Sequence, residues 1–139
     1  MKIKLDIVLD AIECADDAFT YYYDTETKDS VFLQDPLYTG ESNEELEDLI
    51  DNNPDRFYRL PTKYDIHEYS IMEDFVNDLP SGRAKDELAS AIHGKGAFRR
   101  FKNGIEYHGI EQLWYDYRDN AYKQIAIRWC KDNGFEYEE

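Results

Sequence analysis

The chain has 139 residues and a formal net charge of −15, with 42% hydrophobic and 15% aromatic residues. This length and apolar content are typical of one folded domain, so we expect a single acidic domain over residues 1–139. No apolar stretch approaches the ~20 residues that a membrane span needs, and the N-terminal segment lacks a signal-peptide core. We therefore predict a cytoplasmic protein that neither enters nor binds membranes.

The charge is distributed unevenly along the chain. Residues 1–55 contain 16 acids and three lysines, whereas residues 56–139 contain 15 acids and 13 basic residues. An acidic field of this kind repels nucleic acid and attracts basic proteins, although it also serves solubility alone.

The first half of the chain predicts helix, hairpin, helix and strand. Leu5, Val8, Leu9 and Ile12 recur at helical spacing, whereas residues 18–24 alternate and lead through a polar turn to an apolar segment at 31–33. Ser42 and Glu45 have capping-box spacing and predict a helix that ends near residues 52–54. The aromatic segment 56–60 predicts a third strand.

The rest of the chain is expected to be wholly helical. A second capping pair, Thr62 and Asp65, predicts a helix that stops at residues 79–82, followed by helices over 83–92, 96–107 and 111–132 with Gly134 as a C-terminal cap. The predicted fold class is α+β, with a small antiparallel sheet of about three strands and a helical C-terminal half.

Spacings that carry catalytic chemistry are missing. His67, His93 and His108 lie on separate segments, and Cys14 and Cys130 are far apart and are expected to be small buried residues. No nucleophile elbow, phosphate-binding loop or dinucleotide fingerprint occurs. We therefore predict no catalytic residue, no metal, no cofactor and no enzyme activity.

A basic segment at residues 93–104 contains no acid. In its predicted helix Phe98, Phe101 and Ile105 form the buried stripe, while Lys95, Arg99 and Lys102 line its flank. With Gly96 at the helix start, these cations could receive an anion, a nucleotide or an RNA phosphate. Alternatively, they pair internally with the acidic helix, and both interpretations remain open.

The predicted helix after Ser42 carries a row of four acids on one face: Glu44, Glu47, Asp48 and Asp51. Such a row can imitate the closely spaced phosphates of a nucleic acid. We prefer the interpretation that the protein is a non-catalytic interaction module, of the inhibitor, immunity or nucleic-acid-mimic type, which binds a basic protein partner through this acidic face. Binding of nucleic acid is disfavoured by the net charge, except at the basic segment.

Four stretches of the C-terminal half resemble a known family: YSIMEDFVNDL, GKGAFRRFK, LWYDYRDNAY and IRWCKDNG. On these stretches the chain is similar to the bacterial uncharacterised protein family zero-one-five-eight of the UPF series. The resemblance implies a bacterial-type cytosolic protein, and it supplies no catalytic residue because the family has no established activity.

Overall fold

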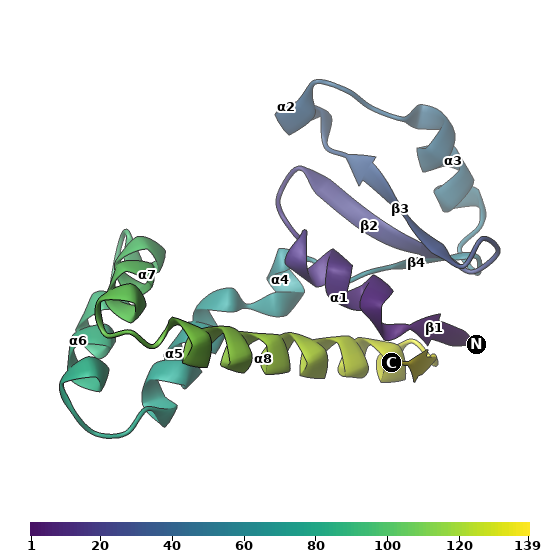
Figure 1. The fold of residues 1–139 in the computed structure, drawn as a ribbon. Coiled ribbons are helices and arrows are strands. Elements are labelled where there is room, and N and C mark those ends of the chain that lie inside the picture. The colour runs from purple at the N-terminus through teal and green to yellow at the C-terminus, as the bar shows by residue number, and fades with distance from the viewer. The chain divides into compact units, whose positions relative to one another are not determined.

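The computed structural model describes residues 1–139 and shows an α+β fold, as predicted (Figure 1). The elements in chain order are β1 (Lys2–Lys4), α1 (Leu5–Glu13), β2 (Phe19–Asp24), β3 (Asp29–Gln34), α2 (Pro36–Thr39), α3 (Glu44–Asn52), β4 (Phe57–Arg59), α4 (Lys63–Ile66), α5 (Glu68–Asp78), α6 (Arg83–Ala91), α7 (Ala97–Tyr107), α8 (Glu111–Asp132) and β5 (Glu136–Glu138). No helix combines the length and the apolar character needed to cross a membrane.

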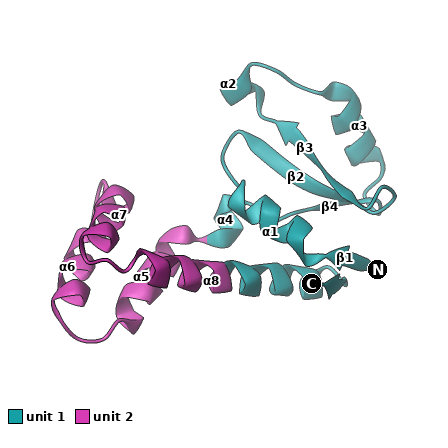
Figure 2. Cartoon of the chain, in the orientation of Figure 1, with its two compact units in different colours: residues 1–66, 122–139 teal, residues 67–121 magenta.

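The chain divides into two compact units (Figure 2). Unit 1 comprises residues 1–66 and 122–139, and unit 2 comprises residues 67–121, so that the boundary falls within α8. The expectation of a single domain stays a prediction.

The sheet of unit 1 has the strand order β3-β2-β4, and both pairings are antiparallel. This arrangement confirms the predicted hairpin and the predicted third strand. Because β2 is the central strand, Tyr22 is paired on both sides, with Val31 and with Arg59. The part of the strand from Tyr22 to Asp24 is thus paired on both sides and offers no free edge to another chain.

One face of the sheet packs against the C-terminal part of the chain through aromatic rings. The Phe135 ring lies 5.6 Å from that of Tyr23 and 4.9 Å from that of Tyr58, and it stacks on Trp129 at 5.4 Å. The indole nitrogen of Trp129 also donates to the carbonyl oxygen of Arg59 at 2.9 Å. These contacts join β2, β4 and the end of α8 in one core.

An ion pair with a buried carboxylate lies at the same end of the sheet, beside the pair of Tyr23 and Tyr58. Asp24 is 3% exposed, and both of its carboxylate oxygens accept hydrogen bonds from Arg56 at 2.9 Å. The bidentate contact ties the last residue of β2 to the residue before β4. The guanidinium of Arg56 holds the pKa of Asp24 down at about 2.

The expectation of a wholly helical second half is wrong at its end. Gly134, with φ of 76°, ends α8, and the amide of Phe135 donates to the carbonyl oxygen of Cys130 at 2.8 Å. The chain then forms β5, which pairs in parallel with β1. Neither three-residue strand shows a strand pattern by itself, and a parallel pairing between the two ends of a chain leaves no local signal.

Unit 2 is a helical unit around an aromatic cluster. The rings of Phe75 and Phe101 lie 5.3 Å and 4.8 Å from that of Trp114, and Tyr117 completes the cluster on Phe75. Helices α6 and α7 approach closely at Gly104, where an added Cβ would lie only 2.6 Å from a methyl group of Leu88. Glycine at this position is therefore a packing requirement.

Two helix starts differ from prediction. Asn43, rather than Ser42, caps α3, because its side-chain oxygen accepts the amide of Leu46 at 3.1 Å. Thr62 and Asp65 form the predicted cap contact, at 2.8 Å, but the helix that they open is the short α4. His67 then adopts a left-handed conformation, with φ of 52°, which interrupts the helical path before α5.

Two residues expected in the core are exposed. Phe98 is 54% exposed, although its neighbours Ala97 and Phe101 are buried as the helical pattern requires. Cys14 is exposed, whereas Cys130 is buried as expected. Cys14 lies just after the last residue of α1, where the apolar stripe has ended.

Candidate charged binding surfaces

Helix α3 presents the acidic row on its solvent side. Glu44, Glu47, Asp48 and Asp51 are all exposed, and their shared face lies opposite the apolar side of the helix that Leu46, Leu49 and Ile50 form. None of the four forms an ion pair within unit 1. The structure therefore brings together the four acids that the sequence grouped.

Stabilisation of α3 by the helix dipole explains only some of the four acids of the row. Acids in the first turn are favoured by the helix dipole, and Glu44 and Glu47 lie there. Asp51 lies in the last turn, where the dipole disfavours a negative charge, and this turn contains no basic residue. The row thus continues past the part of the helix that benefits from acids.

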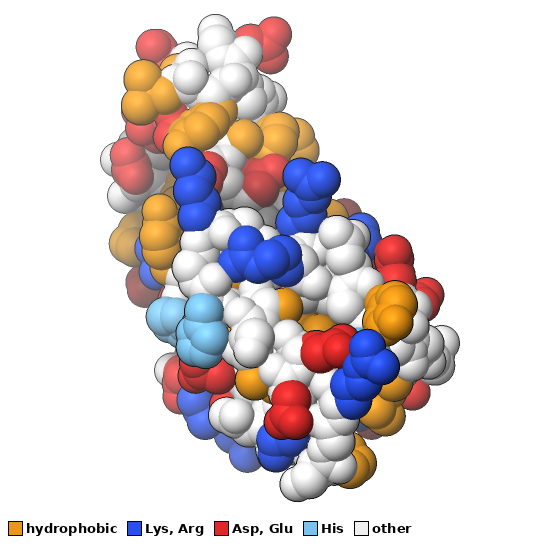
Figure 3. All heavy atoms as spheres, turned by 90° about the vertical axis from the view of Figure 1, so that its left-hand side faces the viewer, with side chains coloured by type: hydrophobic (Ala, Val, Ile, Leu, Met, Phe, Trp, Pro, Cys, Tyr) orange, Lys and Arg blue, Asp and Glu red, His pale blue; other side chains and the backbone are white.

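Helix α7 begins at a glycine corner and carries the basic residues. Gly96 precedes its first residue and adopts φ of 82°, and Lys95, Arg99 and Lys102 are exposed around this end. None of the three cations forms an ion pair within unit 2. Figure 3 looks onto the side of the molecule that bears α6 and α7, where Lys and Arg side chains gather. The alternative, that these cations pair with the acids of α3, stays a prediction.

Arg100 has a structural role at the same corner. Its guanidinium donates to the carbonyl oxygens of Ala91, His93 and Lys95, which lie at the end of α6 and in the turn that follows. Its Nη1 lies only 3.0 Å from where a Cβ on Gly96 would be. Arg100 therefore closes the turn between α6 and α7.

Two other ionisable contacts of unit 2 join separate helices. Burial, together with the carboxylate of Asp78, raises the pKa of Tyr117 to about 12. His108 contacts Glu87 at 2.8 Å, and this contact joins α6 to the end of α7. No three His, Cys, Asp or Glu side chains of residues 1–139 gather so that they could hold a metal ion.

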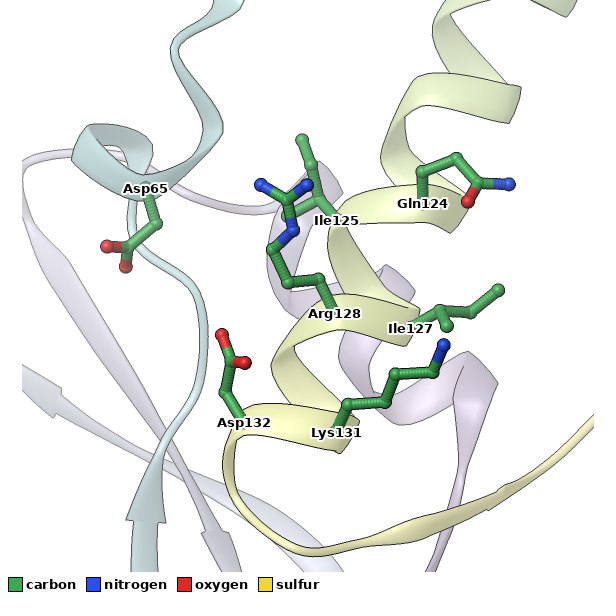
Figure 4. A pocket seen from close by; sticks show the side chains of 7 residues that line it. All are labelled: Asp65, Gln124, Ile125, Ile127, Arg128, Lys131 and Asp132. Carbon is green, nitrogen blue, oxygen red and sulfur yellow. The ribbon is translucent and has the colours of Figure 1, made fainter.

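Unit 1 also contains surface hollows that the sequence did not indicate. One, of about 510 Å³, lies between α4 and the end of α8, and its wall includes Asp65, Arg128, Lys131 and Asp132 (Figure 4). Asp65 is already engaged by Thr62. Because two carboxylates and two cations share this wall, it shows no preference for one charge.

A second hollow, of about 390 Å³, is lined by Tyr22, Tyr38 and Tyr64. The ammonium group of Lys63, on its wall, pairs with Asp17 at 2.8 Å and lies 5.7 Å from the centre of the Tyr64 ring. The tyrosines come from β2, α2 and α4. No spacing in the sequence indicates this grouping.

The comparisons with known proteins agree with the resemblance in the sequence. The model of the uncharacterised protein family UPF0158 matches residues 1–138, so the chain belongs to this family. A UPF0158 protein of Pseudomonas aeruginosa is 29% identical over 90 residues, which is 64% of this chain and 59% of the relative. A UPF0158 protein of Chlamydia trachomatis is 25% identical over 134 residues, which is 94% of this chain and 40% of the relative.

The matched region is thus less than two thirds of the length of either relative. No solved structure matches the chain. The family assignment by itself defines no activity, so the charged surfaces carry the functional argument.

Proposed function

We propose that the protein is a non-catalytic interaction module that binds a basic protein partner through the acidic row of α3. The observation that carries this proposal is that Glu44, Glu47, Asp48 and Asp51 share an exposed helix face and have no ion-pair partner within unit 1. The row includes Asp51, which the helix dipole disfavours. A complementary basic surface would compensate for this unfavourable placement.

The surrounding charge strengthens such an encounter. Unit 1 contains 21 acids and nine basic residues, so a basic partner is attracted before contact. On the helix surface, side chains three and four residues apart are about 5–6 Å apart at Cβ, which gives a closely spaced series of negative charges. This spacing supports binding to a protein surface that otherwise holds phosphates, in the manner of an inhibitor, an immunity protein or a nucleic-acid mimic.

The test compares the protein with two variants of equal net charge. In the acidic-row variant, Glu44→Gln, Glu47→Gln, Asp48→Asn and Asp51→Asn neutralise α3. In the control variant, Asp6→Asn, Asp10→Asn, Glu13→Gln and Glu73→Gln neutralise four other exposed acids. Each immobilised protein is exposed to a bacterial lysate at low and high salt, and the captured proteins are quantified by mass spectrometry.

We expect the unchanged protein and the control variant to capture the same basic protein, with binding that falls steeply at high salt. The acidic-row variant should lose it. Equal capture by all three proteins would show that net charge alone, rather than the row, attracts partners. Capture of no basic protein would also contradict the proposal.

A further inference from the structure

Phe98 is the only exposed phenylalanine of unit 2. It lies in the first turn of α7 and is 54% exposed, whereas Ala97, Phe101 and Ile105 anchor the same helix in the core. Its ring makes none of the aromatic contacts that link Phe75, Phe101, Trp114 and Tyr117. More than half of the surface of Phe98 therefore stays in solvent, outside the aromatic cluster of unit 2.

The free cations of unit 2 surround this ring. Lys102 follows Phe98 by one helical turn, Arg99 is adjacent, and Lys95 lies in the turn before the helix.

The other four basic residues of unit 2 are engaged within the unit: Arg83 with Glu87, Lys85 with the carbonyl oxygen of Asn77, Arg100 with three carbonyl oxygens, and Arg118 with Asp119. Every basic side chain of unit 2 without such a partner thus lies beside Phe98.

The backbone under this surface is held in place. Arg100 fixes the turn through the carbonyl oxygens of Ala91, His93 and Lys95, and Phe101 and Ile105 are each 2% exposed. A rigid support lowers the entropy cost of binding, because little of the backbone needs to be ordered.

We propose that the surface of Lys95, Phe98, Arg99 and Lys102 binds single-stranded nucleic acid. The three cations would contact successive phosphates, and the exposed ring of Phe98 would stack on one base. Stacking requires an unpaired base, so a single strand fits this surface better than a duplex does. The aromatic ring also favours a nucleic acid over an acidic protein, which offers carboxylates but no base.

The net charge of the chain does not oppose this binding locally. Unit 2 contains ten acids and seven basic residues, so it is far closer to neutral than unit 1. The nearest acid along α7 is Glu106, one turn after Lys102, and it forms no ion pair with it. This binding is independent of the acidic row, because it uses other residues and the opposite charge.

The test uses the full-length protein and fluorescently labelled 12-nucleotide oligouridine, with fluorescence anisotropy as the readout. Neutralising three phosphates of a single strand should give a slope of about −2 in log affinity against log salt concentration. The variant Lys95→Gln, Arg99→Gln and Lys102→Gln should bind at least about tenfold more weakly and show a slope near zero. The charge-matched control, Lys4→Gln, Lys28→Gln and Lys131→Gln, should bind like the unchanged protein.

Phe98 is tested separately because it distinguishes stacking from charge. Phe98→Ala should weaken oligouridine binding by about 5- to 100-fold with the salt slope unchanged, and Phe98→Trp should restore the affinity. A melting temperature equal to that of the unchanged protein verifies that each variant is folded.

Three further probes distinguish the ligand classes: a 12-base-pair duplex, polyglutamate and vesicles with anionic lipids. The proposal requires oligouridine to bind more tightly than each of them. Absence of oligouridine binding, equal binding of the duplex, tighter binding of polyglutamate or of the vesicles, or an unaffected Phe98→Ala variant would overturn it. None of these outcomes bears on the capture of a basic protein by α3.

Discussion

The two units carry their charge and their packing in different ways. Unit 1 combines a small sheet with 21 acids and nine basic residues, whereas unit 2 is helical and contains ten acids and seven basic residues. Unit 1 contains the buried carboxylate of Asp24, and unit 2 has the ring cluster of Phe75, Phe101 and Trp114. The acidity of the chain is thus largely a property of one unit.

The difference shows that surface charge and core construction are separable in this protein. The four acids of α3 are exposed, and Ile50 is the one buried residue of this helix. These acids therefore contribute little to the packing of unit 1. The cations of α7 lie on a helix with three buried residues. The tryptophans allow the two cores to be observed separately, because Trp114 lies in unit 2 and Trp129 in unit 1.

The largest expected effect comes from removing a ring of the cluster in unit 2. Phe101→Ala should lower the free energy of unfolding by about 3–5 kcal/mol, because it leaves a cavity beside Phe75 and Trp114. Urea unfolding is followed by the fluorescence of Trp114 in a Trp129→Phe background.

Phe98→Ala in the same background is the matched control. Its ring is 54% exposed, so the expected change is within about 0.5 kcal/mol. Equal losses for the two substitutions would show that the exposed and the buried phenylalanine do not differ as the structure describes.

The next effect concerns the ion pair of unit 1. Asp24→Asn should lower the free energy of unfolding by about 2–4 kcal/mol near neutral pH, because Arg56 loses its buried charged partner. Urea unfolding is followed by Trp129 in a Trp114→Phe background.

The pH dependence gives an independent measure of the same contact. The pKa of Asp24 is lowered to about 2, so its carboxylate stabilises the folded state above the unfolded pKa of about 4. That stabilisation, about 2 kcal/mol, should be lost as the pH falls from about 4 to about 2. The difference between the unchanged protein and Asp24→Asn should shrink over this range, and a constant difference would contradict the assigned role.

The smallest effect concerns the start of α3. Asn43→Ala should lower the free energy of unfolding by about 1 kcal/mol, because the amide of Leu46 loses its acceptor. Ser42→Ala should change it by less than half as much. Urea unfolding in the Trp114→Phe background measures both, and a larger effect of Ser42→Ala would place the cap where the sequence predicted it.

Local patterns predicted most of the elements. The apolar spacing around Val8 and Ile12 predicted α1, the alternation of residues 19–24 predicted the central strand, and the spacing after Arg83 predicted α6, α7 and α8. The acidic face of α3 and the flank of α7 followed from the same periodicity, because helical spacing determines which side chains share a face.

The errors occurred where neighbouring residues have equal local preferences or where partners lie far apart in sequence. Ser42 and Asn43 are both good caps, and only the start of the helix at Glu44 distinguishes them. Phe98 lies at the edge of the apolar stripe of α7. The packing of the other helices decides whether a neighbouring side chain covers that edge.

The sequence by itself determined the family, the α+β class, the acidity of the first half, the four acids on one face of α3, and the two cations Arg99 and Lys102 on the flank of α7. These properties depend on composition and on spacing along the chain. The tertiary structure alone decided that β1 pairs with β5, that Arg100 closes the turn before α7, and that Phe98 stays in solvent beside the three cations. Each of these features depends on how segments that are distant in the sequence pack together, and a local sequence pattern does not predict that packing.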